Sequence, residues 1–182
     1  MPPHGPEPIS ARRGVLVIPA FNEAPRLAGL LAAIDAQGLP LEKVVVDDGS
    51  RDATSQVAAQ AGAPVLRHPF NLGYGAGLQT GYKYALSVDA PWVVQMDADG
   101  QHDPRDVRRL LEPIQRGECD LSIGSRFLEP TRYKMDPLRR LGRRFFIAIA
   151  RAFGFRITDP TSGFQALGRR VLELYVGDAF PS

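Results

Sequence analysis

Residues 43–61 read KVVVDDGSRDATSQVAAQA and carry the clearest fold signal in the chain. The run from Lys43 to Asp47 is apolar between its ends, as in a strand buried on both faces of a parallel sheet. Asp-Asp-Gly-Ser then favours a tight turn. From Asp52, a good helix N-cap, to Ala61, small and apolar residues predict a helix. A strand, a turn and a helix in this order form one unit of an α/β fold.

The same alternation extends along the chain in both directions. The expected strands are Val15–Pro19, Lys43–Asp47, Pro64–Arg67, Trp92–Met96 and Leu121–Gly124. The expected helices are Arg26–Gln37, Asp52–Ala61, Tyr74–Leu86 and Pro104–Gln115. Repeated strand–helix units predict an α/β fold with a Rossmann-like, mostly parallel sheet and helices on both faces.

Composition supports a single globular domain. The 182 residues are 44% hydrophobic and 23% charged, with a net charge of +2, and no apolar run nears the roughly 18 residues that span a membrane. A lone cysteine, Cys119, excludes a disulfide framework and suits a reducing, cytoplasmic compartment. Residues 1–13 contain four prolines, which predicts a disordered tail before one domain over 14–182.

Acidic residues follow three of the expected strands. The segments are Pro19-Ala20-Phe21-Asn22-Glu23, Asp47-Asp48-Gly49-Ser50 and Asp97-Ala98-Asp99-Gly100-Gln101. Ligands of open parallel sheets bind beyond the carboxyl ends of the strands. Three acidic clusters at one edge would repel each other, so we expect a cation or a ligand rich in hydrogen-bond donors between them.

Asp97, Asp99 and Gln101 are the strongest metal candidates. Alternate residues leaving a strand point to the same side, so the three side chains could face one ion, and Mg²⁺ or Mn²⁺ prefers such oxygen ligands. The motif alone also fits a solvated acidic turn.

In the pair Asp47 and Asp48, one carboxylate is expected to bind a ribose or base edge while the other anchors the loop; a simple turn is the alternative.

Six segments, taken in order and spacing, resemble the family 2 glycosyltransferases of the GT-A fold. They are VIPAFNE (17–23), VVVDDGSRDAT (44–54), NLGYGAG (71–77), QMDADGQHDP (95–104), IGSRF (123–127) and DPTSGFQAL (159–167). The likeness covers roughly residues 14–175 and is to the dolichyl-phosphate mannose synthase and polyprenyl-phosphate glycosyltransferase branch. It implies metal-dependent, inverting transfer of a sugar from a nucleotide diphosphate-sugar (GDP-mannose or UDP-glucose type) to a polyprenyl or dolichyl phosphate.

The resemblance also implies site residues. The donor nucleotide would contact Pro19, Phe21, Glu23, Val46, Asp48, Asp97, Ala98 and Asp99. Mg²⁺ or Mn²⁺ would be held by Asp97, Asp99 and Gln101. Arg126 and Arg139 would hold the acceptor phosphate, and Asp159 is the candidate base near the sugar. Gln165 stands where the family usually has arginine. The chain stops at Ser182 where relatives continue, so we expect the C-terminal part of the family's domain to be absent.

A basic segment lies between the last two motifs. Residues 126–156 hold nine Lys or Arg and two acidic residues. Within it, Leu138–Phe155 would form an amphipathic helix with arginines opposite an apolar stripe. Such a helix can lie in the headgroup region of an anionic membrane, or pack its stripe on the domain. Because a polyprenyl acceptor resides in the membrane, we expect peripheral contact with its inner face, and no nucleic-acid partner.

Three other classes remain to be weighed. A sugar-phosphate nucleotidyltransferase would ordinarily show a glycine- and lysine-rich loop after the first strand, and this chain has no lysine there. The sequence supports a Rossmann oxidoreductase even less, since no G-x-G-x-x-G follows that strand. A non-catalytic remnant that binds nucleotide-sugars differs from an enzyme by binding without turnover.

Overall fold

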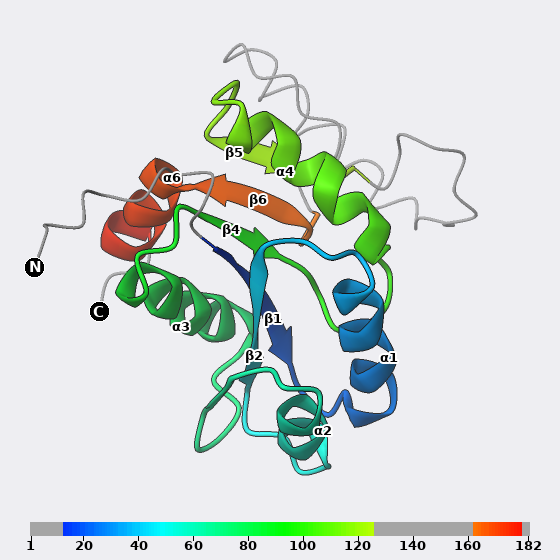
Figure 1. Cartoon of the computed structure of the whole chain (residues 1–182). Coiled ribbons are helices and arrows are strands. Elements are labelled where there is room, and N and C mark those ends of the chain that lie inside the picture. Colours follow the sequence, from blue (N-terminus) through cyan, green and yellow to red (C-terminus); the bar gives the residue numbers. More distant parts are fainter. Residues whose placement is uncertain (1–12, 126–161, 180–182) are drawn as a thin grey trace, which may run out of the picture.

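The computed structural model describes residues 13–125 and 162–179, whose strands form one six-stranded sheet in the order β3-β2-β1-β4-β6-β5 (Figure 1). The strands are β1 (Gly14–Ala20), β2 (Leu41–Asp47), β3 (Val65–Arg67), β4 (Trp92–Gln95), β5 (Leu121–Ile123) and β6 (Gln165–Gly168). The helices are α1 (Ala24–Asp35), α2 (Thr54–Gln60), α3 (Tyr74–Ser87), α4 (Val107–Gln115) and α6 (Arg169–Leu174), with a 3₁₀ turn η2 (Pro104–Asp106) and a π-helical turn η3 (Tyr175–Ala179).

The register of β1 brings the acidic strand ends to one edge. β1 pairs in parallel with all seven residues of β2, from Gly14 opposite Leu41 to Ala20 opposite Asp47. On its other side β1 pairs in parallel with β4, with Val17 opposite Gln95. Because these strands run the same way, their carboxyl ends lie together. The predicted mostly parallel sheet is confirmed.

The sequence interpretation missed β6. This strand lies between β4 and β5 and is antiparallel to both, with Gln165 opposite Gln95 and Ile123. Its four residues, Gln-Ala-Leu-Gly, are too few to show a periodic pattern, and the last of them is a glycine. The antiparallel direction starts β6 at the carboxyl end of β4. The segment before β6 is thereby brought to the edge that carries the acidic loops.

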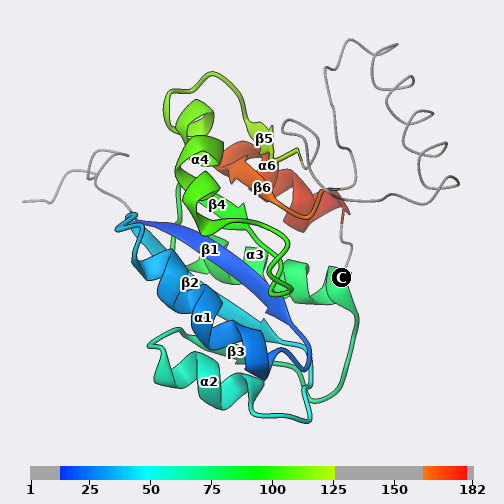
Figure 2. The same cartoon turned by 90° about the vertical axis from the view of Figure 1, so that its right-hand side faces the viewer.

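Helices cover both faces of the sheet. In Figures 1 and 2, α1, α2 and α4 lie on one face, and α3 and α6 on the other. Alternate side chains of β1 enter the two cores: Leu16 and Ile18 pack under α1, α2 and α4, whereas Val15 and Val17 pack under α3 and α6. This alternation explains why β1 is buried along its whole length.

Most predicted boundaries differ from the observed ones by one or two residues. α2 begins at Thr54 rather than at Asp52. The Asp52 carboxylate lies before the helix and accepts hydrogen bonds from the first amides of two helices, Thr54 N of α2 at 3.0 Å and Ala24 N of α1 at 3.2 Å. The fourth strand ends at Gln95 rather than Met96. The predicted helix from Pro104 opens as the η2 turn before α4.

Several predictions lie outside the described residues and stay predictions. They concern the tail up to residue 12, Arg126, Arg139, Asp159 and the segment Leu138–Phe155. Among the helices at 13–125 and 162–179, none combines the length and the apolar character needed to cross a membrane.

The contact between α3 and β1 requires a glycine at position 81. A Cβ atom there would lie 2.2 Å from Val17 Cγ1. We expect Gly81→Ala to lower the free energy of unfolding by about 1–3 kcal/mol, measured by urea denaturation. Gly29→Ala in α1 is the matched control, since its Cβ would meet nothing within 4 Å, and it should stabilise by up to about 1 kcal/mol. If Gly81→Ala stabilised the protein as much as Gly29→Ala, the close contact between α3 and β1 at Gly81 would be contradicted.

Candidate functional site

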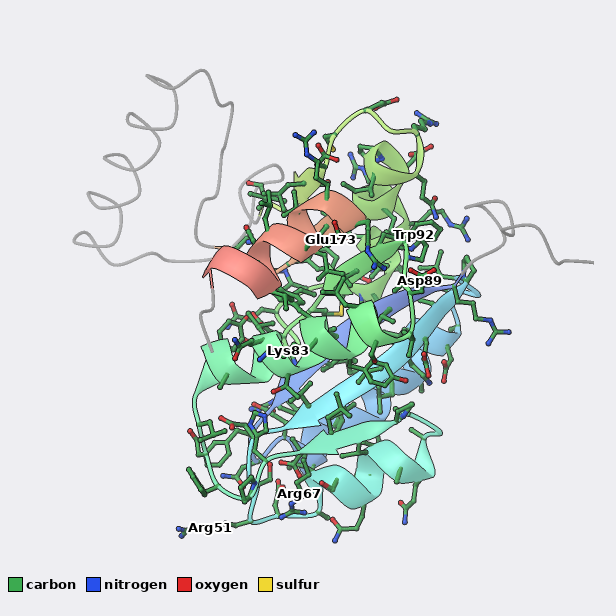
Figure 3. The ribbon with its side chains drawn as sticks, turned by 90° about the vertical axis from the view of Figure 1, so that its left-hand side faces the viewer. Arg51, Arg67, Lys83, Asp89, Trp92 and Glu173 are labelled. Carbon is green, nitrogen blue, oxygen red and sulfur yellow. The ribbon has the colours of Figure 1, made fainter. Side chains whose placement is uncertain are left out.

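Hydrogen bonds join the loops that follow β1 and β2. Asn22 N donates to Ser50 Oγ at 2.9 Å, and Arg51 N donates back to Asn22 Oδ1 at 2.9 Å. Glu23 N donates to Thr54 Oγ1 at 2.9 Å. Arg51 and Arg67 lie near this edge, at the opposite end of the molecule from Trp92 (Figure 3). The two loops therefore form one connected floor at the carboxyl end of the sheet.

Asp47 supports this floor from inside. Its side chain is fully buried, Oδ1 accepts from Ser50 N at 2.8 Å, and Oδ2 accepts from the Ser55 hydroxyl. The Arg67 guanidinium lies 3.7 Å from Oδ2. Burial alone would raise the pKa of Asp47, but the hydrogen bonds from Ser50 and Ser55, with the charge of Arg67, outweigh it and lower that pKa.

Asp48 anchors the glycine-rich loop before α3. Its Oδ1 lies 2.7 Å from His68 Nδ1 and accepts from Leu72 N at 2.8 Å, while Oδ2 accepts from Gly73 N at 2.8 Å. His68 Nε2 lies 2.9 Å from Thr80 Oγ1. Burial acts to raise the pKa of Asp48, yet these hydrogen bonds prevail and lower it. A carboxylate only accepts, so His68 Nδ1 carries the hydrogen.

Both carboxylates of the pair thus anchor the chain, whereas the sequence interpretation assigned that role to one of them. Gly49 lets the two loops meet: it has a φ of +73°, and a Cβ there would lie 2.5 Å from the Phe70 carbonyl carbon. Asp48 as a residue is only 5% exposed, and a ribose or base contact by its carboxylate remains a prediction.

Asp97 is held by a tyrosine. The Tyr74 hydroxyl donates to Asp97 Oδ1 at 2.7 Å and accepts from Gln95 Nε2 at 3.0 Å. Gln95 Oε1 in turn accepts from the Tyr82 hydroxyl. Burial raises the pKa of Tyr74, as do its hydrogen bond to Asp97 and the charge of that carboxylate. Burial also raises the pKa of Tyr82. Both phenols therefore keep their protons at neutral pH.

The segment before β6 packs against Asp97 and Tyr74. A Cβ at Gly163 would lie 2.4 Å from Asp97 Oδ2 and 2.9 Å from the Tyr74 hydroxyl oxygen. The next residue, Phe164, is 4% exposed, and its ring stacks on His102 with centroids 4.9 Å apart. Gly124 gives the ring its space, because a Cβ there would lie 2.4 Å from Phe164 Cδ1.

The chain turns after β4, so the expected alternation of Asp97, Asp99 and Gln101 along an extended strand is wrong. Gly100 has a φ of +77°, and the exposed Asp99 accepts from Gln101 N at 2.9 Å. The Gln101 side chain lines an open groove beside Gln37 at the end of α1.

The donor set still fits a hard divalent cation. Two carboxylates and an amide oxygen are ligands of the kind that Mg²⁺ and Mn²⁺ take, with waters and substrate phosphates completing the shell. Asp97 Oδ2 receives no hydrogen bond from the described residues, and Gly163 places no side chain against it. Residues 13–125 and 162–179 contain no cluster of three or more His, Cys, Asp or Glu that could hold a metal alone. Any ion here would depend on non-protein ligands.

The predicted donor residues divide into buried and accessible groups. The buried ones are Pro19, Val46, Asp48 and Ala98. Phe21 is 44% exposed, and Asp99 is also exposed, whereas Glu23 and Asp97 are partly buried. Glu23 pairs with Arg26 at 3.0 Å. Each acidic strand end therefore has at least one partner within the chain, and the expectation that a cation or a ligand rich in hydrogen-bond donors lies between the three clusters stays a prediction.

Sequence reasoning missed Tyr74, Gln95 and Gly163 as members of this site. Tyr74 stands inside NLGYGAG, a stretch whose glycines are explained equally well by close packing. Gln95 lies within a buried apolar strand, and Gly163 belongs to a distant motif. The one available signal was a tyrosine between glycines at the start of a helix.

Comparisons with known proteins agree with this fold. Residues 15–175 match the family model described as glycosyl transferase family 2. The chain is 32% identical over 186 residues to the polyprenol monophosphomannose synthase of Mycolicibacterium smegmatis, covering 93% of this chain and 68% of that protein. It is 36% identical over 168 residues to the dolichol-phosphate mannosyltransferase of Pyrococcus furiosus, covering 87% and 47%.

A solved structure shows the same fold. Glucosyl-3-phosphoglycerate synthase from Mycobacterium tuberculosis, crystallised with Mn²⁺ and UDP-glucose, superposes with a TM-score of 0.71 at 24% identity. The match covers 89% of this chain and 58% of that one. The chain therefore has a GT-A fold and belongs to glycosyl transferase family 2. It spans about two thirds or less of the length of these three proteins.

The Asp47 network predicts acid-sensitive stability. A pKa below the ordinary 3.8 in the folded state stabilises the fold above that pH, and the contribution disappears as the pH falls through the folded-state pKa. We expect Asp47→Asn to lower the free energy of unfolding by about 1–3 kcal/mol at pH 7. Urea denaturation from pH 7 to 3 should show the gap to wild type narrowing below pH 3.8. The exposed Asp106→Asn is the control; a gap that stays constant or widens in acid would contradict the assignment.

Proposed function

We propose that this chain transfers a sugar from a nucleotide diphosphate-sugar, of the GDP-mannose or UDP-glucose type, to a polyprenyl phosphate. The observation that carries the proposal is the Asp97-Ala98-Asp99 turn at the carboxyl end of β4 in a family 2 fold. The printed names of two relatives, a polyprenol monophosphomannose synthase and a dolichol-phosphate mannosyltransferase, support this acceptor class.

The accessible residues of the edge would bind the donor. Phe21 presents an exposed ring beside the floor for the nucleotide. Asp97, Asp99 and Gln101 would hold Mg²⁺ or Mn²⁺, which when bound stabilises the charge that develops on a leaving diphosphate. A protein of the same fold has been crystallised with Mn²⁺ and UDP-glucose, so this fold accommodates both.

A phosphate acceptor does not require a strong general base from the protein. A phosphate monoester has a second pKa of about 6, so it is already an anionic nucleophile near neutral pH and needs mainly to be positioned. Arg126 and Arg139 would grip its oxygens, since a guanidinium binds phosphate in two places. Asp159 would serve as base if the acceptor were a hydroxyl. Direct displacement at the anomeric carbon would invert its configuration.

The membrane contact follows from the same acceptor. A polyprenyl chain remains in the bilayer, and the basic segment Leu138–Phe155 would lie in the anionic headgroup region. With this contact, the chain would act as a peripheral protein at the inner face of the membrane.

Asp99 provides the test of the donor site. We expect Asp99→Asn to abolish Mn²⁺-dependent binding of UDP or GDP, because the variant loses an anionic oxygen that a hard cation requires. Calorimetry with each nucleotide, with and without Mn²⁺, measures this. Asp106→Asn, an exposed change on η2, should bind as the wild type does. Full Mn²⁺-dependent binding by Asp99→Asn would refute the ligand assignment, and wild-type binding without any sugar transfer would favour a binding remnant.

Arg126 provides the test of the acceptor site. We expect Arg126→Ala to raise the concentration of polyprenyl phosphate needed for half-maximal transfer, since one guanidinium fork is lost, while nucleotide affinity stays unchanged. Transfer of radiolabelled sugar at varied acceptor concentration measures the first, and calorimetry the second. Arg116→Ala, which removes a partner of Glu112 on α4, is the control. Equal loss of donor and acceptor binding would contradict a role at the acceptor.

A further inference from the structure

One line of hydrogen bonds connects the interior beneath α3 to the Asp97 carboxylate, and its direction is determined. Asp97 can only accept, so the Tyr74 hydroxyl donates its single hydrogen to Oδ1. The Tyr74 oxygen must then accept, and it does so from the Gln95 amide nitrogen. The Gln95 carbonyl consequently faces Tyr82, whose hydroxyl donates to it. Because every donor points the same way, the bonds polarise one another toward Asp97.

The inner end of this line is rigidly packed. Tyr82 is 1% exposed and Gln95 is 3% exposed. Gln95 is also paired in the sheet on both sides, with Val17 of β1 and Gln165 of β6. The Tyr82 ring rests against Tyr175, with ring centroids 6.1 Å apart. A group bonded to Gln95 is therefore tied to the centre of the sheet.

Tyr74 itself is placed by its hydroxyl and not by apolar burial. The residue is 50% exposed, yet its oxygen is bonded on both sides, to Gln95 and to Asp97. The backbone before it is fixed, since Asp48 accepts from the amides of Leu72 and Gly73. A half-exposed aromatic ring at the first residue of α3 gains little from packing, so its hydrogen bonds account for its position.

The two oxygens of Asp97 have different surroundings. Oδ1 takes the phenol hydrogen, while Oδ2 faces Gly163, where a Cβ would lie only 2.4 Å away. Rotation of the carboxylate would break the bond to Tyr74. Oδ1 is taken by the phenol, whereas Oδ2 accepts no hydrogen bond from the described residues, so Oδ2 is the oxygen available to a ligand.

We infer that Tyr74 is a positioning residue of the donor site, whose hydroxyl holds the Asp97 carboxylate in the orientation that receives a divalent cation with its nucleotide diphosphate. The inference rests on the proposed function. Tyr74 acts through Asp97 and supplies no ligand itself. Loss of a hydrogen-bonding partner behind a metal ligand typically lowers metal affinity about 10- to 100-fold.

Tyr74→Phe tests the role with the full chain. The probe is UDP, titrated by calorimetry with and without Mn²⁺. We expect Mn²⁺-dependent affinity to fall about 10- to 100-fold, while affinity for UDP without Mn²⁺ and the urea midpoint stay near wild type. Disruption of the fold would weaken both kinds of binding. Tyr84→Phe is the matched control, because Tyr84 lies on the same helix and its hydroxyl also donates to a carboxylate, that of Glu42 on β2 at 3.0 Å. This variant should bind UDP as the wild type does, with and without Mn²⁺.

Crystal structures of the metal-free wild type and Tyr74→Phe provide an independent readout. We expect the Asp97 carboxylate to keep one orientation in the wild type and to rotate in the variant. Unchanged Mn²⁺-dependent affinity in Tyr74→Phe would overturn the inference and leave the proposed function standing. If the wild type bound neither UDP nor GDP with Mn²⁺, the proposed donor site would fall. In that case the crystal structures decide the inference. An unmoved Asp97 carboxylate in Tyr74→Phe would overturn the inference as well, whereas a rotated carboxylate would still show that Tyr74 orients Asp97.

Discussion

The Asp48 carboxylate accepts the backbone hydrogens of Leu72 and Gly73, and this interaction links the end of β2 to the start of α3. The next residue is Tyr74, whose hydroxyl meets Asp97 at the end of β4. A single buried acid thus connects two strand ends that lie on opposite sides of β1 in the sheet. The edge is arranged by a chain of contacts that begins at Asp48, and the orientation of Asp97 depends on it.

The acidic residues of this edge form two groups, one buried and holding the loops, the other at the surface. Asp47 and Asp48 are buried, and hydrogen bonds outweigh the desolvation that would otherwise raise their pKa values. Both therefore remain charged and hold the loops near neutral pH. At the turn after β4, Asp99 is exposed and Asp97 is only partly buried. This division reconciles a strongly acidic edge with a stable fold, because backbone amides and hydroxyls compensate the buried charges and leave the outer pair for a ligand.

Much of the fold was predictable because parallel strands buried on both faces read as apolar runs. β1 to β5 were each expected within one or two residues. β6 was not, since a four-residue strand has no readable period and its partners β4 and β5 precede it in the chain by 42 residues or more. The acidic loops were also predictable as a group, because strand direction alone brings Asp48 and Asp97 to one edge. Their hydrogen-bonding partners were not, since His68, Tyr74 and Gly163 belong to other segments.

The sequence by itself determined the order of β1 to β5 and of the four helices α1 to α4 among them, the family, and the edge at which the acids gather. These properties follow from local periodicity and from motifs that are contiguous in the chain. Only the tertiary structure decided which acids are supports and that Tyr74 and Gly163 lie against Asp97. The physical reason is that each of these depends on atoms brought within 3 Å by packing from distant segments, such as the Tyr74 hydroxyl 2.7 Å from Asp97, and no local pattern encodes such contacts.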